Sequence, residues 1–235
     1  DLQSMRGTAH DKLWNSEYGQ KQKTERDHIY FGTVLEHILL QNLCAFYDVG
    51  EHNEMRLHGA DWNDALDMAW EKGESVAFTC AYAGNLRNIA KTLRQLEEIS
   101  GSSKIEIAHE MEDLLAGSVE LYEDAARKQA LLAGYAKKCE HNISGDTIVV
   151  RLDQLAANLE EKADWMMKNI RANEWVKDGE DGWFNGYYDN HGRKVEGVMD
   201  ESVRMMLTGQ VVAIMSGTAT EDQVESICRS ADKYL

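Results

Sequence analysis

Residues 86–96, with the sequence Leu-Arg-Asn-Ile-Ala-Lys-Thr-Leu-Arg-Gln-Leu, give the clearest indication of the fold. Their apolar positions recur every three or four residues, as they do on one face of an α-helix that packs against a core. The run stops at Ser100-Gly101-Ser102-Ser103, a polar segment that is typical of a helix end. The spacing predicts a helix that ends near residue 100.

The same apolar spacing recurs along most of the chain. Thr220-Glu221-Asp222-Gln223 is a capping box, in which a hydroxyl and an amide side chain bond the first backbone N–H groups of a helix. Six helices arranged as antiparallel hairpins predict an all-α protein, either a closed bundle or half of a twelve-helix toroid. The other predicted helices cover residues 27–50, 107–141 with a bend near Gly134, 152–166, 203–215 and 220–231.

Residues 173–197 have a different character. Aromatic side chains precede Asp189-Asn190-His191-Gly192, a cluster that favours a turn, and Val195 follows it. This pattern predicts one small β-hairpin inserted among the helices. Residues 1–26 are polar and lack periodic apolar positions, so we expect mostly loop there.

The charge balance excludes several kinds of partner. Among 235 residues, 25 are Lys or Arg and 41 are Asp or Glu, so the net charge is −16. We therefore expect no nucleic acid and no membrane as partner, since there is neither a basic stripe nor an apolar run of ~18 residues. Four widely spaced cysteines and no secretory signal predict reduced, mostly buried thiols in a cytoplasmic protein.

Two features of the sequence predict that it is a piece of a longer polypeptide. It begins with Asp1 rather than methionine, and it contains no proline, although proline averages about 5% of residues.

Arg56-Leu57-His58-Gly59-Ala60-Asp61-Trp62-Asn63-Asp64-Ala65-Leu66-Asp67 is the stretch that points to chemistry. A sugar ring packs its C–H face on an indole, and its hydroxyl groups bond to carboxylate and amide oxygens. A carboxyl group beside an apolar wall can have its pKa raised until it donates a proton. The alternative is an acidic surface turn in which Asp61 caps a helix and Asp64 is its third residue.

Three segments of the chain resemble one family in the same order. Gly59–Asp67, followed by Gly73-Glu74-Ser75-Val76, resembles the central motif of the inverting glycoside phosphorylases of glycoside hydrolase family 94. Trp183–Gly192 is similar to their W-x-x-x-x-Y-D-x-x-G hairpin, and Gln210–Gly217 to their Q-x-W-A-V-I-S-G helix, with Val212 in place of tryptophan. The first motif looks most like that of the β-1,2-oligoglucan phosphorylases. We call these segments the first, second and third motif.

The resemblance implies a site and a mechanism. Asp64 matches the general acid, Trp62 the aromatic residue that contacts the sugar, and Asp61 and Asn63 the residues that shape the site; Arg56 is expected to line it. Asp64 would protonate the glycosidic oxygen of a β-linked gluco-oligosaccharide while inorganic phosphate attacks the anomeric carbon from the opposite face. Phosphate is already anionic, so no second carboxylate is needed, and neither a metal nor a cofactor other than this co-substrate is expected.

The resemblance also implies an architecture. Residues 1–235 would form part of a catalytic (α/α)6 barrel that is truncated at both ends relative to the family. The phosphate-binding residues of the family lie beyond the third motif, so we expect the chain alone to be inactive. Half a barrel would expose apolar helix faces, which predicts a homo-oligomer or association with the remainder of the barrel.

Several alternatives stay open at this point. An inverting hydrolase on the same fold would need a second carboxylate, for which Glu51 or Asp67 are candidates. A non-catalytic helical scaffold or carbohydrate-binding segment would use the first motif only as a turn. His52 and His58 are further candidates for the pocket wall. Gln210 would be either a buried support or an exposed polar residue. Tyr187, Tyr188 and Asp189 would either pack across strands or reach the sugar site.

Overall fold

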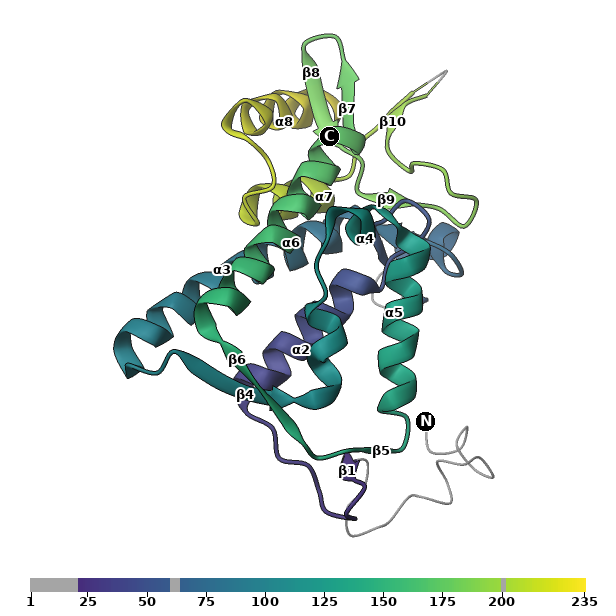
Figure 1. Ribbon diagram of the computed structural model, residues 1–235. Helices are drawn as coiled ribbons and strands as arrows, with labels where there is room; N and C mark the ends of the chain where they lie inside the picture. Colours follow the sequence, from purple (N-terminus) through teal and green to yellow (C-terminus); the bar gives the residue numbers. More distant parts are fainter. Residues whose placement is uncertain (1–20, 60–63, 200–201) are drawn as a thin grey trace.

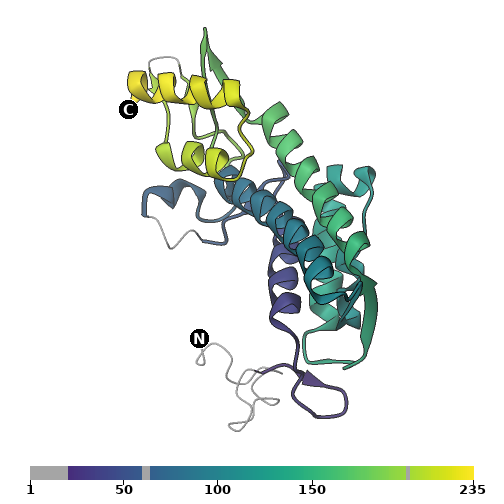
Figure 2. The same cartoon turned by 90° about the vertical axis from the view of Figure 1, so that its left-hand side faces the viewer.

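The structure, a computed structural model, describes residues 21–59, 64–199 and 202–235. Two long antiparallel helices, α3 (Val76–Ser100) and α6 (Leu152–Asn173), lie side by side and run through most of the molecule, as Figures 1 and 2 show. The remaining helical elements are α2 (Val34–Tyr47), α4 (Val119–Glu123), α5 (Ala125–Lys138), α7 (Leu207–Met215), α8 (Glu221–Tyr234) and the 3-10 helices η1 (Asp64–Ala69) and η2 (His109–Leu115).

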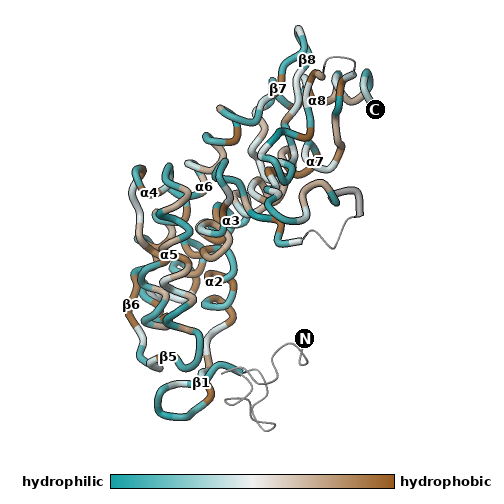
Figure 3. The backbone as a smooth tube through the Cα atoms, turned by 90° about the vertical axis from the view of Figure 1, so that its right-hand side faces the viewer, coloured by the Kyte–Doolittle hydropathy of each residue, from teal (hydrophilic) through white to brown (hydrophobic). Residues whose placement is uncertain are grey.

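Each end of the α3–α6 pair carries its own group of elements. Helices α2, α4 and α5 gather at one end and α7 and α8 at the other, as Figure 3 shows. At the first end Leu86 and Leu93 of α3 share a buried core with Leu159 of α6. At the other end Trp183 and Ile227 belong to a second buried cluster that includes the first turns of α3. The two helices therefore join two small cores into one molecule.

Short sheets connect these elements. Parallel β1 (Lys23–Thr24) and β5 (Asn142–Ile143) pair near the N-terminal end of the described chain. The antiparallel pairs are β4 (Lys104–Ala108) with β6 (Thr147–Arg151), β7 (Trp175–Asp178) with β8 (Asp181–Phe184), and β10 (Gly197–Val198) with β11 (Val203–Arg204). A three-stranded antiparallel sheet has the order β2 (Met55–Arg56), β3 (Glu74–Ser75) and β9 (Tyr187–Tyr188).

The described residues are mostly helical, and most of the predicted helices are present. The helix quoted first is α3, which Ser75 caps at its start and Gly101, with φ +67°, ends. The capping box at Thr220 begins α8. Helix α2 starts later than predicted, and α7 starts at Leu207 because Val203–Arg204 pair as β11. Closure of an (α/α)6 barrel stays a prediction.

The single helix predicted over residues 107–141 is wrong. Residues 104–108 form β4, and η2, α4 and α5 follow as separate elements. Ser118 and Asp124 each cap a new helix by accepting a backbone N–H, from Leu121 and Arg127 respectively, so the chain restarts twice. The apolar residues between 107 and 122 lie on one side of these pieces and imitate the stripe of a continuous helix.

The predicted turn at Asp189–Gly192 is present, and a separate hairpin precedes it along the chain. Strands β7 and β8 are joined at Gly179-Glu180, where Gly179 has φ +64°. The Asp189–Gly192 turn follows β9, which pairs with β3, and the chain folds back across the turn: Asp189 N–H donates to the carbonyl of Arg193, and Val195 N–H donates to that of Tyr187. An isolated bridge between Tyr188 and Lys194 closes it.

Two further observations concern the predicted thiols and partners. All four cysteines are free; Cys80 is buried as predicted, whereas Cys228 is exposed. In the described part of the chain, no helix combines the length and the apolar character that crossing a membrane requires.

Replacing Leu86 with alanine should lower the free energy of unfolding by about 2–5 kcal/mol, because the deleted side chain leaves a cavity between α3 and α6. Leu96, on the same helix, is 37% exposed and is the matched control; its replacement with alanine should cost about 1 kcal/mol or less. Urea denaturation of the two variants measures both values, and equal losses would contradict the proposed core.

Candidate functional site

The predicted site residues lie on the segment between β2 and β3. Asp61, Trp62 and Asn63 lie outside the described residues. Asp64 is the first residue of η1, and its place is given by the backbone. Arg56 ends β2, immediately before this segment. The structure describes the residues on either side of this segment and the elements that bond to them.

Residues 57–73 form a loop whose two ends are bonded to each other. Strands β2 and β3 pair antiparallel, and Leu57 N–H donates to the carbonyl of Gly73 at 3.0 Å. Leu57 and Ala69 belong to a small buried cluster with Tyr187 beneath the loop. Gly73 N–H in turn donates to the carbonyl of Ala69. We call residues 57–73 the acid loop.

Asp48, which directly follows α2, bonds residues 56–58, which we call the first flank of the acid loop. Its Oδ1 accepts a hydrogen bond from Arg56 Nε at 2.8 Å. The same oxygen forms an ion pair with Nη2 of that guanidinium at 2.7 Å. Its second oxygen lies 2.5 Å from Nε2 of His58. His58 has φ +49°, a conformation that costs free energy in a residue with a side chain and needs such an anchor.

The second motif bonds residues 68–72, which we call the second flank of the acid loop. Asn190, in the turn after β9, donates its backbone N–H to the carbonyl of Met68 at 2.8 Å. Its side-chain Oδ1 accepts the N–H groups of Glu71 at 2.8 Å and Lys72 at 2.9 Å. Strand β9 itself pairs with β3, so the second motif lies directly beside the first.

The third motif supports the second through Gln210, whose side chain is 1% exposed. Its Oε1 accepts the N–H of Phe184 at 2.8 Å and its Nε2 donates to the carbonyl of the same residue at 2.7 Å. Gln210 thus pairs with a backbone edge as a neighbouring strand would. The interpretation of Gln210 as a buried support is confirmed, and its interpretation as an exposed residue is wrong.

Glu196 joins the last two motifs at a buried point. Its Oε1 accepts the N–H of Gly186 in the second motif at 2.8 Å. Its Oε2 accepts hydrogen bonds from Nε2 of Gln210 in the third motif at 3.3 Å and from the N–H of Met206 at 2.7 Å. The carbonyl of Gly186 accepts the N–H of Val76, the first residue of α3. The three motifs therefore form one hydrogen-bonded unit around the base of the acid loop.

A set of buried carboxylates behind β3 was missed by sequence reasoning. Glu74 accepts the backbone N–H groups of His52 and Glu54, and His52 Nδ1 lies 2.8 Å from it. The His52 ring stacks on Tyr188 with centroids 3.7 Å apart, and Tyr188 donates its hydroxyl to Glu174 at 2.8 Å. Burial, and then the nearby Glu174, raise the pKa of Glu54 well above its usual value. Acidic residues without apolar periodicity gave no local sign of burial.

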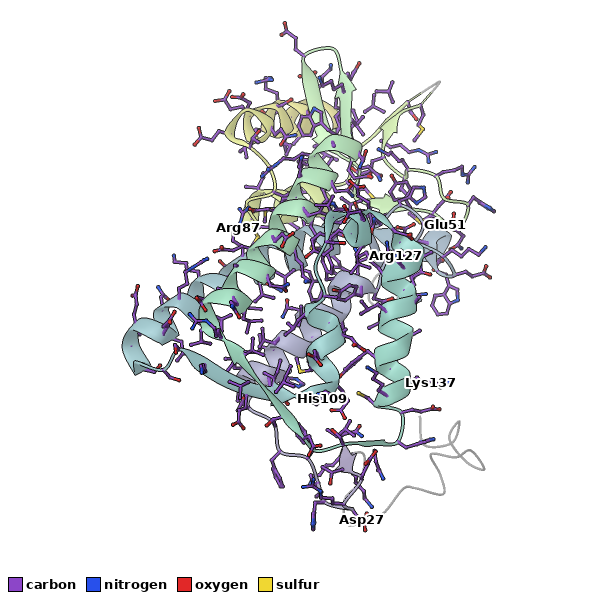
Figure 4. All side chains as sticks on the ribbon, viewed as in Figure 1. Asp27, Glu51, Arg87, His109, Arg127 and Lys137 are labelled. Atoms are coloured by element: carbon purple, nitrogen blue, oxygen red, sulfur yellow. The ribbon has the colours of Figure 1, made fainter. Side chains whose placement is uncertain are left out.

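A polar pocket of about 490 Å³ lies between the second flank of the acid loop and the turn of the second motif. This volume is within the range of small-molecule sites. Arg56 and His52 line this pocket, and His58 is bonded to Asp48; that these residues line a sugar site stays a prediction. Glu51, labelled in Figure 4, contributes to the wall from beside the start of α5. Lys72, Gln129 and Asn190 are further polar residues of the wall.

Tyr187 and Tyr188 lie in β9 and are buried, which confirms cross-strand packing as their arrangement. Asp189 accepts the N–H groups of His191 and Arg193 and thereby forms the turn. Tyr187 packs against Leu57 and Ala69 of the acid loop, and Tyr188 lies in the strand that pairs with β3.

Replacing Glu196 with glutamine should remove a dependence of stability on pH. Burial raises the pKa of Glu196 to about 8, so the folded protein retains a proton that the unfolded chain releases near pH 4.5. As the pH rises between these values, the unfolding free energy of the wild type should fall relative to that of the variant, by up to ~1.4 kcal/mol per pH unit. Urea denaturation across this range measures the difference; parallel pH curves would refute it.

Comparison with known proteins gives one informative match. No family model matches the chain. The chain is 25% identical over 206 residues to a protein named solabiose phosphorylase from Paenibacillus borealis, an alignment that covers 87% of this chain and 19% of that protein. The chain therefore spans about a fifth of the length of the relative it matches. The similarity suggests a distant relationship to glycoside phosphorylases.

Proposed function

We propose that this chain carries the general-acid segment of an inverting glycoside phosphorylase of the family 94 type. The enzyme would cleave a β-linked gluco-oligosaccharide with inorganic phosphate and release a sugar 1-phosphate. The observation that carries the proposal is that the three motifs, which span residues 59 to 217, form one hydrogen-bonded unit: the second motif bonds the loop that contains Asp64, and the third supports the second. The similarity to a phosphorylase adds independent support.

Asp64 is assigned the role of proton donor to the glycosidic oxygen. Trp62 would offer an apolar face to the sugar ring, and Asp61 and Asn63 would accept its hydroxyl groups. Phosphate would attack from the opposite face and invert the anomeric centre, without a second catalytic carboxylate. Arg56 would contribute from the pocket wall, where Asp48 already orients its guanidinium.

The way the acid loop is held suits this chemistry. A general acid is effective when it is fixed within hydrogen-bonding reach of the atom it protonates. Here the loop ends are bonded to each other, Asp48 holds the first flank and Asn190 the second. A loop that served only as a surface turn would not need support on both flanks, one of them from a segment 119 residues away.

We further propose that the chain is part of a catalytic (α/α)6 barrel. Leu207, Val211, Ile214 and Met215 form an apolar stripe on α7 and are 37–81% exposed. Further helices of the barrel, or a second copy of the chain, would cover this stripe.

The test uses the polypeptide encoded by the complete reading frame. With a β-linked gluco-oligosaccharide and phosphate it should release a sugar 1-phosphate of inverted configuration. Asp64→Asn should lower kcat by ~10²–10⁴, the usual contribution of general acid catalysis. The loss should be smaller for a β-glucoside with a nitrophenol leaving group, because that group departs without protonation. Product anomers are identified by NMR.

Asp67→Asn is the matched control, because Asp67 is an exposed carboxylate on the same 3-10 helix. It should retain phosphorolysis. Release of free sugar without phosphate, together with loss of activity in Asp67→Asn, would instead identify an inverting hydrolase. Unchanged turnover in Asp64→Asn would identify a non-catalytic segment.

A further inference from the structure

Asn190 is unusual in the number of bonds it makes to one distant segment. It lies about 120 residues after the acid loop, yet its backbone and side chain make three hydrogen bonds to residues 68, 71 and 72. Its Oδ1 accepts two successive backbone N–H groups. These groups, on Glu71 and Lys72, lie shortly after η1 and have no other acceptor among the described residues.

The turn that presents Asn190 does not depend on the Asn190 side chain. Asp189 Oδ1 accepts the N–H groups of His191 at 2.8 Å and Arg193 at 2.9 Å, and Arg193 Nε donates to Asp189 Oδ2 at 2.8 Å. Gly192, with φ +71°, completes the turn. Asp189 therefore builds the turn, and Asn190 reaches from it to the acid loop.

Apart from the bonds from Asn190, the end of η1 is held by Ala69, which is buried with Leu57 and Tyr187 and accepts the N–H of Gly73. Met68 and Trp70 are 36% and 52% exposed, and Ala69 is the buried residue between them. Short 3-10 helices have weak internal hydrogen bonds and are marginal without tertiary support. The bonds from Asn190 are consequently a large part of what holds this end of the segment in place.

A movement at this end is transmitted to Asp64. Asp64 and Met68 belong to the same 3-10 helix, which rises about 2 Å per residue, so they lie roughly 8 Å apart along its axis. A rotation of η1 about its C-terminal end moves the backbone of Asp64 further than it moves the residues close to that end, because Asp64 is the residue of η1 farthest from it. General acid catalysis is sensitive to displacements of ~1 Å.

From these contacts we infer that Asn190 is a positioning residue for the general acid: its side chain anchors the end of η1 and thereby sets the position of Asp64. The catalytic consequence rests on the proposed function, whereas the anchoring does not. Asn190 is not assigned any contact with substrate or phosphate.

The experiment compares Asn190→Ala, Asn190→Asp and the control Asn88→Ala in the polypeptide of the complete reading frame. Asn88 is an exposed asparagine on α3, outside the acid loop. Asn190→Ala should speed amide hydrogen exchange in a peptide spanning residues 64–73, because Glu71 and Lys72 lose their acceptor. Aspartate keeps an acceptor oxygen at the same place, so Asn190→Asp should restore the protection. Asn88→Ala should leave exchange unchanged.

Activity provides the second readout. Asn190→Ala should lower kcat for the oligosaccharide by ~10–100-fold with a much smaller change in KM. The loss should shrink for the nitrophenyl β-glucoside, which needs little help from the acid, and Asn190→Asp should recover most of the rate. A merely structural role would reduce turnover of both substrates alike.

Three results would overturn the inference. Unchanged exchange over residues 64–73 in Asn190→Ala would exclude the anchor. Faster exchange with unchanged kcat would exclude an effect on the acid. Equal losses for the two leaving groups would assign the defect to folding or binding. Failure of the proposed function is recognised separately, since Asp64→Asn would then be as active as the wild type while the exchange measurement still reports on the anchor.

Discussion

The pairing of β3 with both β2 and β9 is the contact on which the candidate site depends. Strands of two residues are too short to be stable alone, and buried side chains hold this sheet together. Glu74 is 2% exposed, and its carboxylate accepts the N–H groups of His52 and Glu54. A side chain at Gly50 would lie 2.2 Å from Glu74, so the absence of one lets the chain approach. This single residue of β3 connects the end of α2, the acid loop and the second motif.

The buried Lys162 holds the chain between η2 and α4, at the other end of the α3–α6 pair, in a similar way. Lys162 Nζ donates to the carbonyl of Ala116 at 2.9 Å and to Oδ1 of Asn158 at 2.8 Å, and Asn158 Nδ2 donates to the carbonyl of Leu115. Burial lowers the pKa of Lys162 to about 7. A buried amine is costly unless its donors are satisfied. Ala116, between η2 and α4, supplies one of those acceptors because its carbonyl is not used by a helix there.

This explains where the sequence was and was not informative. Helices α3 and α8 could be predicted because each has a continuous apolar face and its own capping residues, all local features. The break after residue 115 could not, since Lys162 and Asn158, which support it, lie more than forty residues away. Strand β4 alternates Ile105 and Ile107 with polar residues, but it is identified as a strand only beside β6.

The same reasoning applies to the site. The first motif was recognisable because its acid, indole and amide lie within four residues. The contacts that hold it are not local, since Asn190 lies 119 residues from Glu71. The sequence order of the three motifs carried no sign that they touch. The structure explains their joint presence, because the second motif anchors the first and the third supports the second.

Under the proposed function, the pKa of the general acid is a remaining physical requirement. A proton donor is most effective when its pKa is near the working pH, which for a carboxyl group requires desolvation or a neighbouring negative charge. The side chains of Asp67 and Met68 in η1 and of Trp70 just after it are exposed, so this part of the chain leaves the described end of the acid loop open to water on at least one side. The sugar, the attacking phosphate dianion or additional protein would have to supply the desolvation and the charge. In that case Asp64 would become an effective acid only when the reactants are assembled, which would favour transfer to phosphate over proton loss to solvent.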